Sequence, residues 1–242
     1  MATVLPALFV VASWWASTLA VLVVDGLPRA TSRYSLAAAT VLALGGGYGL
    51  YATARVDSPA AAYGAFACAL AVWAWHELTF LLGVVTGPRK EPCPTDARGW
   101  RRFAYATLAI IHHELALAAT TVAVALLTAG APNQVGRDAF LVLWVMRLSA
   151  KLNVFLGVRN LATDFIPAHL RYLVTYFRQS RLNPLMPLSL VGGAAAAVWL
   201  ASRGALAHTL TATLLGLAVV EHLFLALPLP DAALWRWAVR RR

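Results

Sequence analysis

The sequence predicts an all-α protein: a polytopic membrane bundle of about seven transmembrane helices, with one amphipathic helix on the cytoplasmic surface. Composition is the first reason. Of the 242 residues, 60% are hydrophobic and only 12% are charged, and the mean hydropathy is +0.69. A soluble domain of this length has about a quarter of its residues charged. The second reason is that the apolar residues form long runs, and most basic residues fall in the links between them.

Seven stretches are long enough to cross a bilayer, which takes roughly 20 mostly apolar residues. The links between them contain Gly, Pro and polar turn signals, as in "DGLPR" and "TGPRKEPCP". We therefore predict one membrane-embedded domain over residues 1–242, with spans near 4–24, 34–53, 59–86, 103–129, 138–158, 186–202 and 205–228.

The order of the basic residues gives an orientation. Alternate links carry 3 Lys and Arg residues on one side of the membrane and 15 on the other. Because Lys and Arg are retained on the cytoplasmic side, the N-terminus is predicted to be periplasmic and the C-terminus cytoplasmic. The net charge of +10 is spread over several links, so we expect membrane lipid as the partner and no nucleic acid.

The link between the fifth and sixth spans has an amphipathic pattern. We predict a helix near residues 164–180 that lies on the cytoplasmic surface, with its arginines toward anionic lipid. The alternative is an extension of the fifth span. One helical face would carry Ile166, Leu170, Leu173 and Phe177, and other faces Arg171, Arg178 and Arg181.

Polar residues inside the apolar runs are the candidate functional residues. His and Glu are adjacent in three spans, as His76-Glu77, His112-His113-Glu114 and Glu221-His222. A carboxylate in hydrocarbon costs several kcal/mol unless it is paired, ligated or hydrated. Glu77 precedes Arg89, and His113 follows Arg102, by nearly the same number of residues. At the rise of an α-helix, both residues therefore lie about 16–18 Å into the membrane from the basic link that contains these arginines. We expect these groups to form one polar layer in the cytoplasmic half of the membrane.

The fifth span supplies cations for this layer. Arg147 and Lys151 are four residues apart and therefore project from the same side of the helix. Asn153, two residues beyond Lys151, points in another direction.

Three interpretations of the layer remain open, besides a transport or proton path. In the first, the glutamates pair with Arg147 and Lys151, and the histidines hydrogen-bond between helices. In the second, Glu and His hold a di-iron or di-manganese centre, although the Glu-x-x-His spacing of such bundles is missing. In the third, an imidazole of His76, His112, His113 or His222 is the axial ligand of a chlorin or haem.

Several long motifs resemble one family. These are "WAWHELTFLLGVVTGPR" followed by "CP", then "HHELAL", "LWVMRLSAKLNVFLGVRN" and "DFIPAHLRYLVTYF", which span about residues 70–190. Together they resemble the PuhE family of photosynthetic complex assembly proteins, which are polytopic inner-membrane proteins of anoxygenic phototrophic bacteria. No catalytic residues are established for that family.

The resemblance implies a role in building the photosynthetic reaction centre and its light-harvesting antenna. The partners it implies are reaction-centre or antenna subunits and proteins of bacteriochlorophyll synthesis. Combined with the polar layer, it leads us to expect an assembly factor that binds or delivers bacteriochlorophyll through the His/Glu residues. The alternative is a membrane di-iron oxidoreductase that acts on a tetrapyrrole intermediate.

Overall fold

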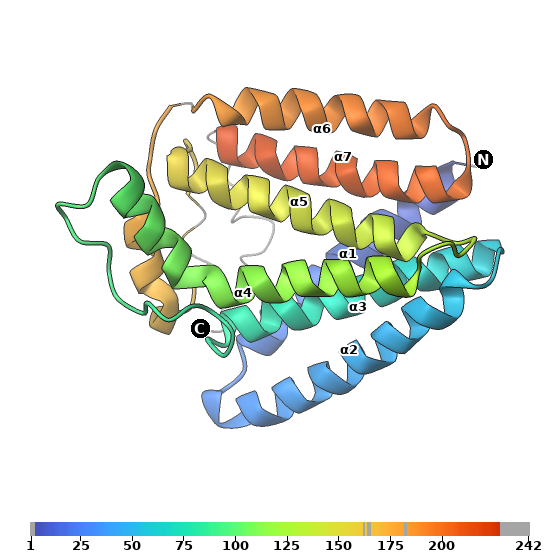
Figure 1. Ribbon diagram of the computed structural model, residues 1–242, viewed down its shortest axis with the longest axis horizontal. Helices are drawn as coiled ribbons and strands as arrows, with labels where there is room; N and C mark the ends of the chain where they lie inside the picture. Colours follow the sequence, from blue (N-terminus) through green and yellow to red (C-terminus); the bar gives the residue numbers. More distant parts are fainter. Residues whose placement is uncertain (1–2, 162, 164–165, 182, 228–242) are drawn as a thin grey trace.

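The computed structural model describes residues 3–161, 163, 166–181 and 183–227, and every named element in this part of the chain is a helix. Figure 1 shows α6, α7, α5 and α3 in succession across the bundle, with α2 at the opposite edge from α6. The elements are α1 (Val4–Asp25), η1 (Arg29–Thr31), α2 (Ser32–Ala54), α3 (Pro59–Leu81), α4 (Gly99–Leu127), α5 (Val135–Leu156), η3 (Ala168–Tyr176), α6 (Leu185–Ala201) and α7 (Leu206–Ala226).

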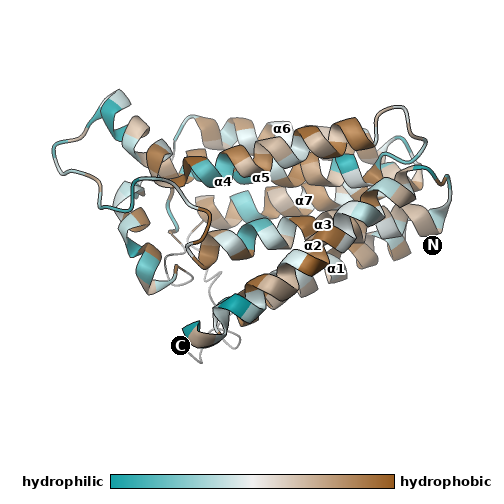
Figure 2. Ribbon diagram, turned by 60° about the horizontal axis from the view of Figure 1, so that its bottom comes forward, coloured by the Kyte–Doolittle hydropathy of each residue, from teal (hydrophilic) through white to brown (hydrophobic). Residues whose placement is uncertain are grey.

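The chain is a multi-pass membrane protein. Six helices are long and apolar enough to cross a bilayer: α1, α2 with the 3-10 turn before it, α3, α4, α5 and α7. The sixth predicted span, 186–202, corresponds to α6, which is apolar but has only 17 residues. Figure 2 shows mostly hydrophobic residues along the helices and hydrophilic residues in the connections.

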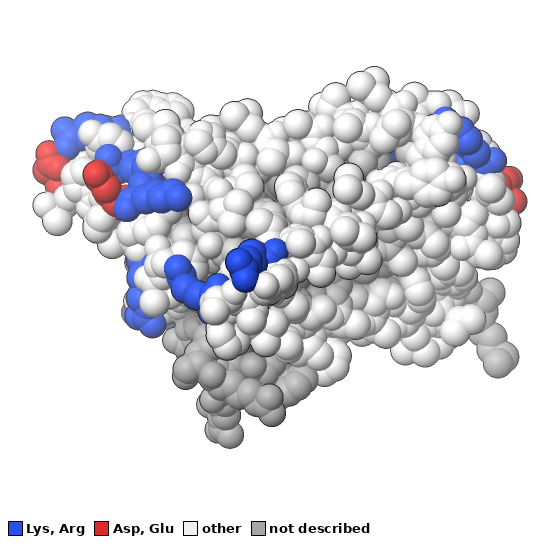
Figure 3. All heavy atoms as spheres, turned by 90° about the horizontal axis from the view of Figure 1, so that it is seen from below, with Lys and Arg blue, Asp and Glu red and all other residues white. Residues whose placement is uncertain are grey.

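Charged side chains divide between the two ends of the bundle. On the face drawn in Figure 3 they gather toward both ends and leave a broad band without Lys, Arg, Asp or Glu. In the described connections and helix ends, one end carries Arg55, Arg137 and Arg203. The other, called the basic end below, carries Arg29, Arg33, Arg89, Lys90, Arg98, Arg101, Arg102, Arg159, Arg171, Arg178 and Arg181.

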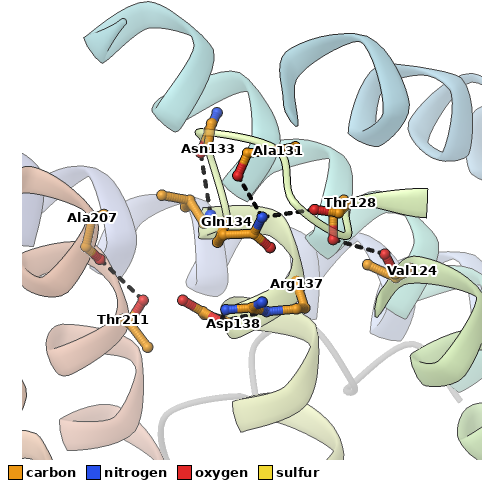
Figure 4. A network of polar contacts seen from close by, with 10 residues as sticks. Val124, Thr128, Ala131, Asn133, Gln134, Arg137, Asp138, Ala207 and Thr211 are labelled. Carbon is orange, nitrogen blue, oxygen red and sulfur yellow. Dashed lines mark hydrogen bonds and ion pairs between the residues drawn. The ribbon is translucent and has the colours of Figure 1, made fainter. Parts of the chain in front are cut away.

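The end with fewer basic residues is closed by a hydrogen-bonded turn between α4 and α5 (Figure 4). Gln134 Nε2 donates to the carbonyl oxygens of Thr128 and Ala131, both at 2.6 Å. Asn133 Nδ2 donates to the carbonyl oxygen of Thr53 at the end of α2, at 3.0 Å. The side-chain amides thus hydrogen-bond the main chain within this turn and connect the turn to the end of α2.

The third predicted span, 59–86, is wrong at its end, because α3 stops at Leu81 and the chain then turns onto α4. The N–H of His113 donates to the carbonyl oxygen of Thr86 (3.0 Å), and the N–H of Arg89 donates to that of Leu108 (3.3 Å). Inserted backbone of this kind bends a helix, and Figure 1 shows the first turns of α4 set at an angle to the rest.

The predicted amphipathic α-helix over 164–180 is also different in the structure. Residues 164 and 165 lie outside the described residues, and 168–176 form the 3-10 helix η3. Its buried side chains, Leu170, Leu173 and Tyr176, are spaced by three residues, which is the period of a 3-10 helix. They pack against Ala109 of α4, so this segment buries one side against protein.

Gly87 is the point of closest approach between the 82–89 segment and α4. A Cβ atom there would overlap the main chain of Leu108, Ala109 and Ile110, and such overpacking costs about 1–3 kcal/mol. We expect Gly87→Ala to lower the thermal midpoint in detergent.

The matched control is Gly45→Ala in α2, where a Cβ would meet nothing within 4 Å. Alanine stabilises an exposed helix position by up to about 1 kcal/mol relative to glycine. Equal midpoints for the two variants would contradict the close packing of this segment on α4.

Candidate polar site inside the bundle

The middle of the bundle contains two ion pairs that join three helices. Arg147 Nη2 of α5 lies 2.8 Å from Glu77 Oε2 of α3, with side chains 43% and 13% exposed. One turn further along α5, Lys151 Nζ lies 2.5 Å from Glu114 Oε1 of α4, with side chains 18% and 16% exposed. The four-residue spacing on α5 therefore directs both cations toward α3 and α4.

Glu221 of α7 is the third carboxylate of this layer. It is close enough to Arg147 for the two charges to interact, but it forms no ion pair with any residue that the structure describes. Glu221 is also exposed on the side of the bundle. The layer thus contains three carboxylates and two cations, and Glu221 is the carboxylate without a cation of its own.

Two of the candidate histidines lie in the core beside these ion pairs. His76 is 2% exposed, and its Nε2 lies 3.0 Å from the Thr120 hydroxyl on α4. His113 is completely buried, with its ring centroid 4.6 Å from that of Phe80, and neither ring nitrogen has a hydrogen-bond partner among the described residues. The rings of His76 and His113 are 6.5 Å apart.

His222 belongs to a separate polar cluster between α5, α6 and α7. Its Nε2 lies 3.0 Å from the Ser149 hydroxyl, and its Nδ1 lies 2.8 Å from the carbonyl oxygen of Ala218. Asn153 Nδ2 donates to the carbonyl oxygen of Ser149 (3.0 Å) and to Ser189 Oγ (3.1 Å). Ser149 and Ser189 were not predicted. The i, i+4 spacing of Ser149 and Asn153 on one helix face was the available signal.

His112 is apart from all of these groups. It lies near the middle of the 29-residue α4 and is exposed on its outer surface, between the exposed residues Leu108 and Leu115. His112 therefore does not face the glutamates, because the adjacent His113 occupies the inward face.

The ligands for a di-iron or di-manganese centre are not assembled in the described part of the chain. No three His, Cys, Asp or Glu side chains lie together there at metal-binding distances. Glu77 and Glu114 each bind a cation instead. A tetrapyrrole with central magnesium needs only one accessible imidazole beside an apolar surface, and His112 between Leu108 and Leu115 fits that requirement.

Comparison with known proteins places the chain in a family. All of residues 1–242 match the family described as "Protein of unknown function (DUF3623)". The chain belongs to the DUF3623 family. It is similar to a relative from Rhodobacter capsulatus named "Uncharacterized 30.4 kDa protein in puhA 5'region", with 37% identity over 246 residues that cover 96% of this chain and 89% of the relative. No solved structure matches the chain.

The Glu114–Lys151 pair gives a stability prediction for this DUF3623 protein. Removing one partner of a buried ion pair costs about 3–5 kcal/mol, because the other charge stays buried, whereas replacing both partners is often neutral. We expect Glu114→Gln to lower the thermal midpoint in detergent strongly, and Glu114→Gln/Lys151→Met to recover most of the loss.

Glu77→Gln is the control for this experiment. It leaves Arg147 within reach of Glu221, so we expect a smaller loss of stability than for Glu114→Gln. A double variant as unstable as Glu114→Gln would contradict the role of Glu114 as the counter-ion of Lys151.

Proposed function

We propose that this protein is an assembly factor for the photosynthetic reaction centre and its light-harvesting antenna, embedded in the bacterial inner (intracytoplasmic) membrane. One observation carries the proposal: a relative 37% identical over nearly the whole chain is named for its position in the puhA 5' region. The resemblance to the PuhE family points the same way, because genes of that family lie with those for the reaction-centre H subunit and bacteriochlorophyll synthesis.

The polar layer favours a binding role over catalysis. Four of its charged groups are engaged with one another as ion pairs. Conversely, wide apolar surfaces are available to other membrane helices. In α1 only Pro6 and Val10 are buried, and in α6 only Met186 and Gly193 are buried, among the residues described in these helices. We propose that transmembrane helices of reaction-centre or antenna subunits dock on such surfaces.

Bacteriochlorophyll delivery is the finer part of the proposal, and His112 is the residue to which we assign it. Magnesium in a chlorin accepts an axial imidazole nitrogen, and an imidazole facing lipid is open to a lipid-soluble macrocycle. His112 has that exposure, whereas His76, His113 and His222 are buried. The exposed Leu108 and Leu115 would supply apolar contacts for the macrocycle.

A deletion strain of a phototrophic host tests the proposal. We expect deletion to reduce near-infrared reaction-centre and antenna absorption several-fold, and the wild-type gene to restore it. Unchanged absorption in the deletion strain would overturn the assembly role.

Paired substitutions in that strain separate pigment delivery from folding. We expect His112→Ala to accumulate like the wild type and yet leave pigment-protein levels low, because an exposed side chain contributes little to packing. Leu126→Ala is the control, because Leu126 is also exposed on α4 and is not part of the proposed pigment contact. Full complementation by His112→Ala would remove this residue from the proposal while leaving the assembly role standing.

Reporter fusions test the orientation. We propose that the basic end faces the cytoplasm, because it carries most of the described Lys and Arg residues of the connections. A periplasmic alkaline phosphatase reporter fused after Arg242 should then be inactive, and the same reporter fused in the link at Arg203 should be active. The reverse pattern would invert the topology.

A further inference from the structure

A cavity of about 720 Å³ opens at the basic end, where the turn from α1 to α2, the end of α3 and the start of η3 meet. Its size is in the range of small-molecule sites, which is roughly 300–1,000 Å³. None of the candidate residues predicted for the polar layer lines it. The function proposed above does not use this cavity, and the argument below does not rest on that function.

The polar part of the cavity is positively charged. Arg29 of η1 and Arg171 of η3 line it from two elements far apart in the sequence. Asp25 lines it as well, so two guanidinium groups face one carboxylate and leave a net positive charge. Two arginines brought together from separate elements are suited to a phosphate, whose oxygens accept paired hydrogen bonds from guanidinium.

His169 adds an imidazole whose ring is hydrogen-bonded to the main chain of Leu81. It lines the same cavity, and its buried Nε2 has no hydrogen-bond partner among the described residues. The ring packs closely on Gly83, whose φ of +76° favours glycine and where a Cβ would come within 3.0 Å of the imidazole. Burial first, and the charge of Arg29 second, lower the pKa of His169, which places Arg29 within electrostatic reach of the ring.

Apart from Ser32, the rest of the wall is apolar, and it lies at the ends of candidate membrane-spanning helices. Leu27, Leu82 and Ile166 line the cavity, and α1, α3 and the start of α2 border it. These helices cross the membrane, so their ends mark the boundary between hydrocarbon and head groups. Basic pockets in this position bind the head groups of acidic lipids.

We propose that this cavity binds an amphiphile with a phosphate head and an alkyl tail, the head between Arg29, Arg171 and His169 and the tail along Leu27, Leu82 and Ile166. Two sources supply this chemistry, an acidic phospholipid of the bilayer and an isoprenoid diphosphate. Both are anionic at the head and enter from the lipid phase, so the same residues would hold either one.

The test measures binding to the purified full-length protein in neutral detergent. The probes are short-chain phosphatidylglycerol, geranylgeranyl diphosphate, short-chain phosphatidylcholine and inorganic pyrophosphate. We expect saturable binding of at least one of the first two, and weak or no binding of phosphatidylcholine and pyrophosphate. Preference for phosphatidylglycerol identifies a structural lipid site, and preference for geranylgeranyl diphosphate identifies an isoprenoid site.

Substitutions link the binding to the cavity. Because each charge-assisted hydrogen bond to an anion is worth about tenfold in Kd, we expect Arg29→Gln and Arg171→Gln each to weaken binding about tenfold. Both arginines are exposed, so the thermal midpoint without ligand should not change. Arg33→Gln is the matched control: Arg33 lies near Arg29, hydrogen-bonds the Tyr34 hydroxyl and does not line the cavity.

Three results would overturn the proposal. The first is phosphatidylcholine binding as tightly as both anionic amphiphiles, which would show that the phosphate charge is not recognised. The second is pyrophosphate binding as tightly as either of them, which would show that the tail is not used. The third is equal weakening by Arg33→Gln and by the two cavity variants, which would place the effect in the general charge of the basic end.

Discussion

The two ion pairs on α5 constrain the rest of the bundle. In hydrocarbon, Glu77 and Glu114 carry a large free-energy penalty unless each lies against a cation. Arg147 and Lys151 are one helical turn apart, at 2.8 and 2.5 Å from these carboxylates. The pairs therefore fix the rotation of α3 and α4 about their own axes relative to α5. Once that rotation is set, His76 and His113 face the core and His112 faces lipid.

The bend in α4 follows from the way the chain leaves α3. The main chain from Thr86 to Arg89 bonds to α4 at Leu108 and His113, and only a glycine fits at the contact. This contact lies within two turns of Glu114, so the segment that bends the helix also supports the position of that carboxylate. The same bend directs the first turns of α4 toward η3, where Arg102 donates to the carbonyl oxygens of Phe155 and Tyr176.

The sequence predicted the elements governed by hydropathy and helical geometry. Long apolar runs correspond to the helices, and the spacing of Arg147 and Lys151 placed both cations on one face. It did not predict contacts that depend on tertiary packing. Residues 82–86 are apolar enough to extend a span, yet main-chain bonds to α4 take them out of the helix. Likewise, Leu170, Leu173 and Tyr176 pack together with Ala109 of α4 in a 3-10 helix. The sequence pattern alone indicated an α-helix there.

Neighbouring polar residues in one span face different surroundings. A helix separates neighbours by about 100°, so one member of each pair can face the core while the other meets a different helix or the lipid. In α7, His222 bonds to Ser149 while Glu221 is exposed near Arg147. In α4, His113 is buried while His112 is exposed. The inward members pack between helices, whereas His112 and Glu221 remain exposed on the outside of the bundle.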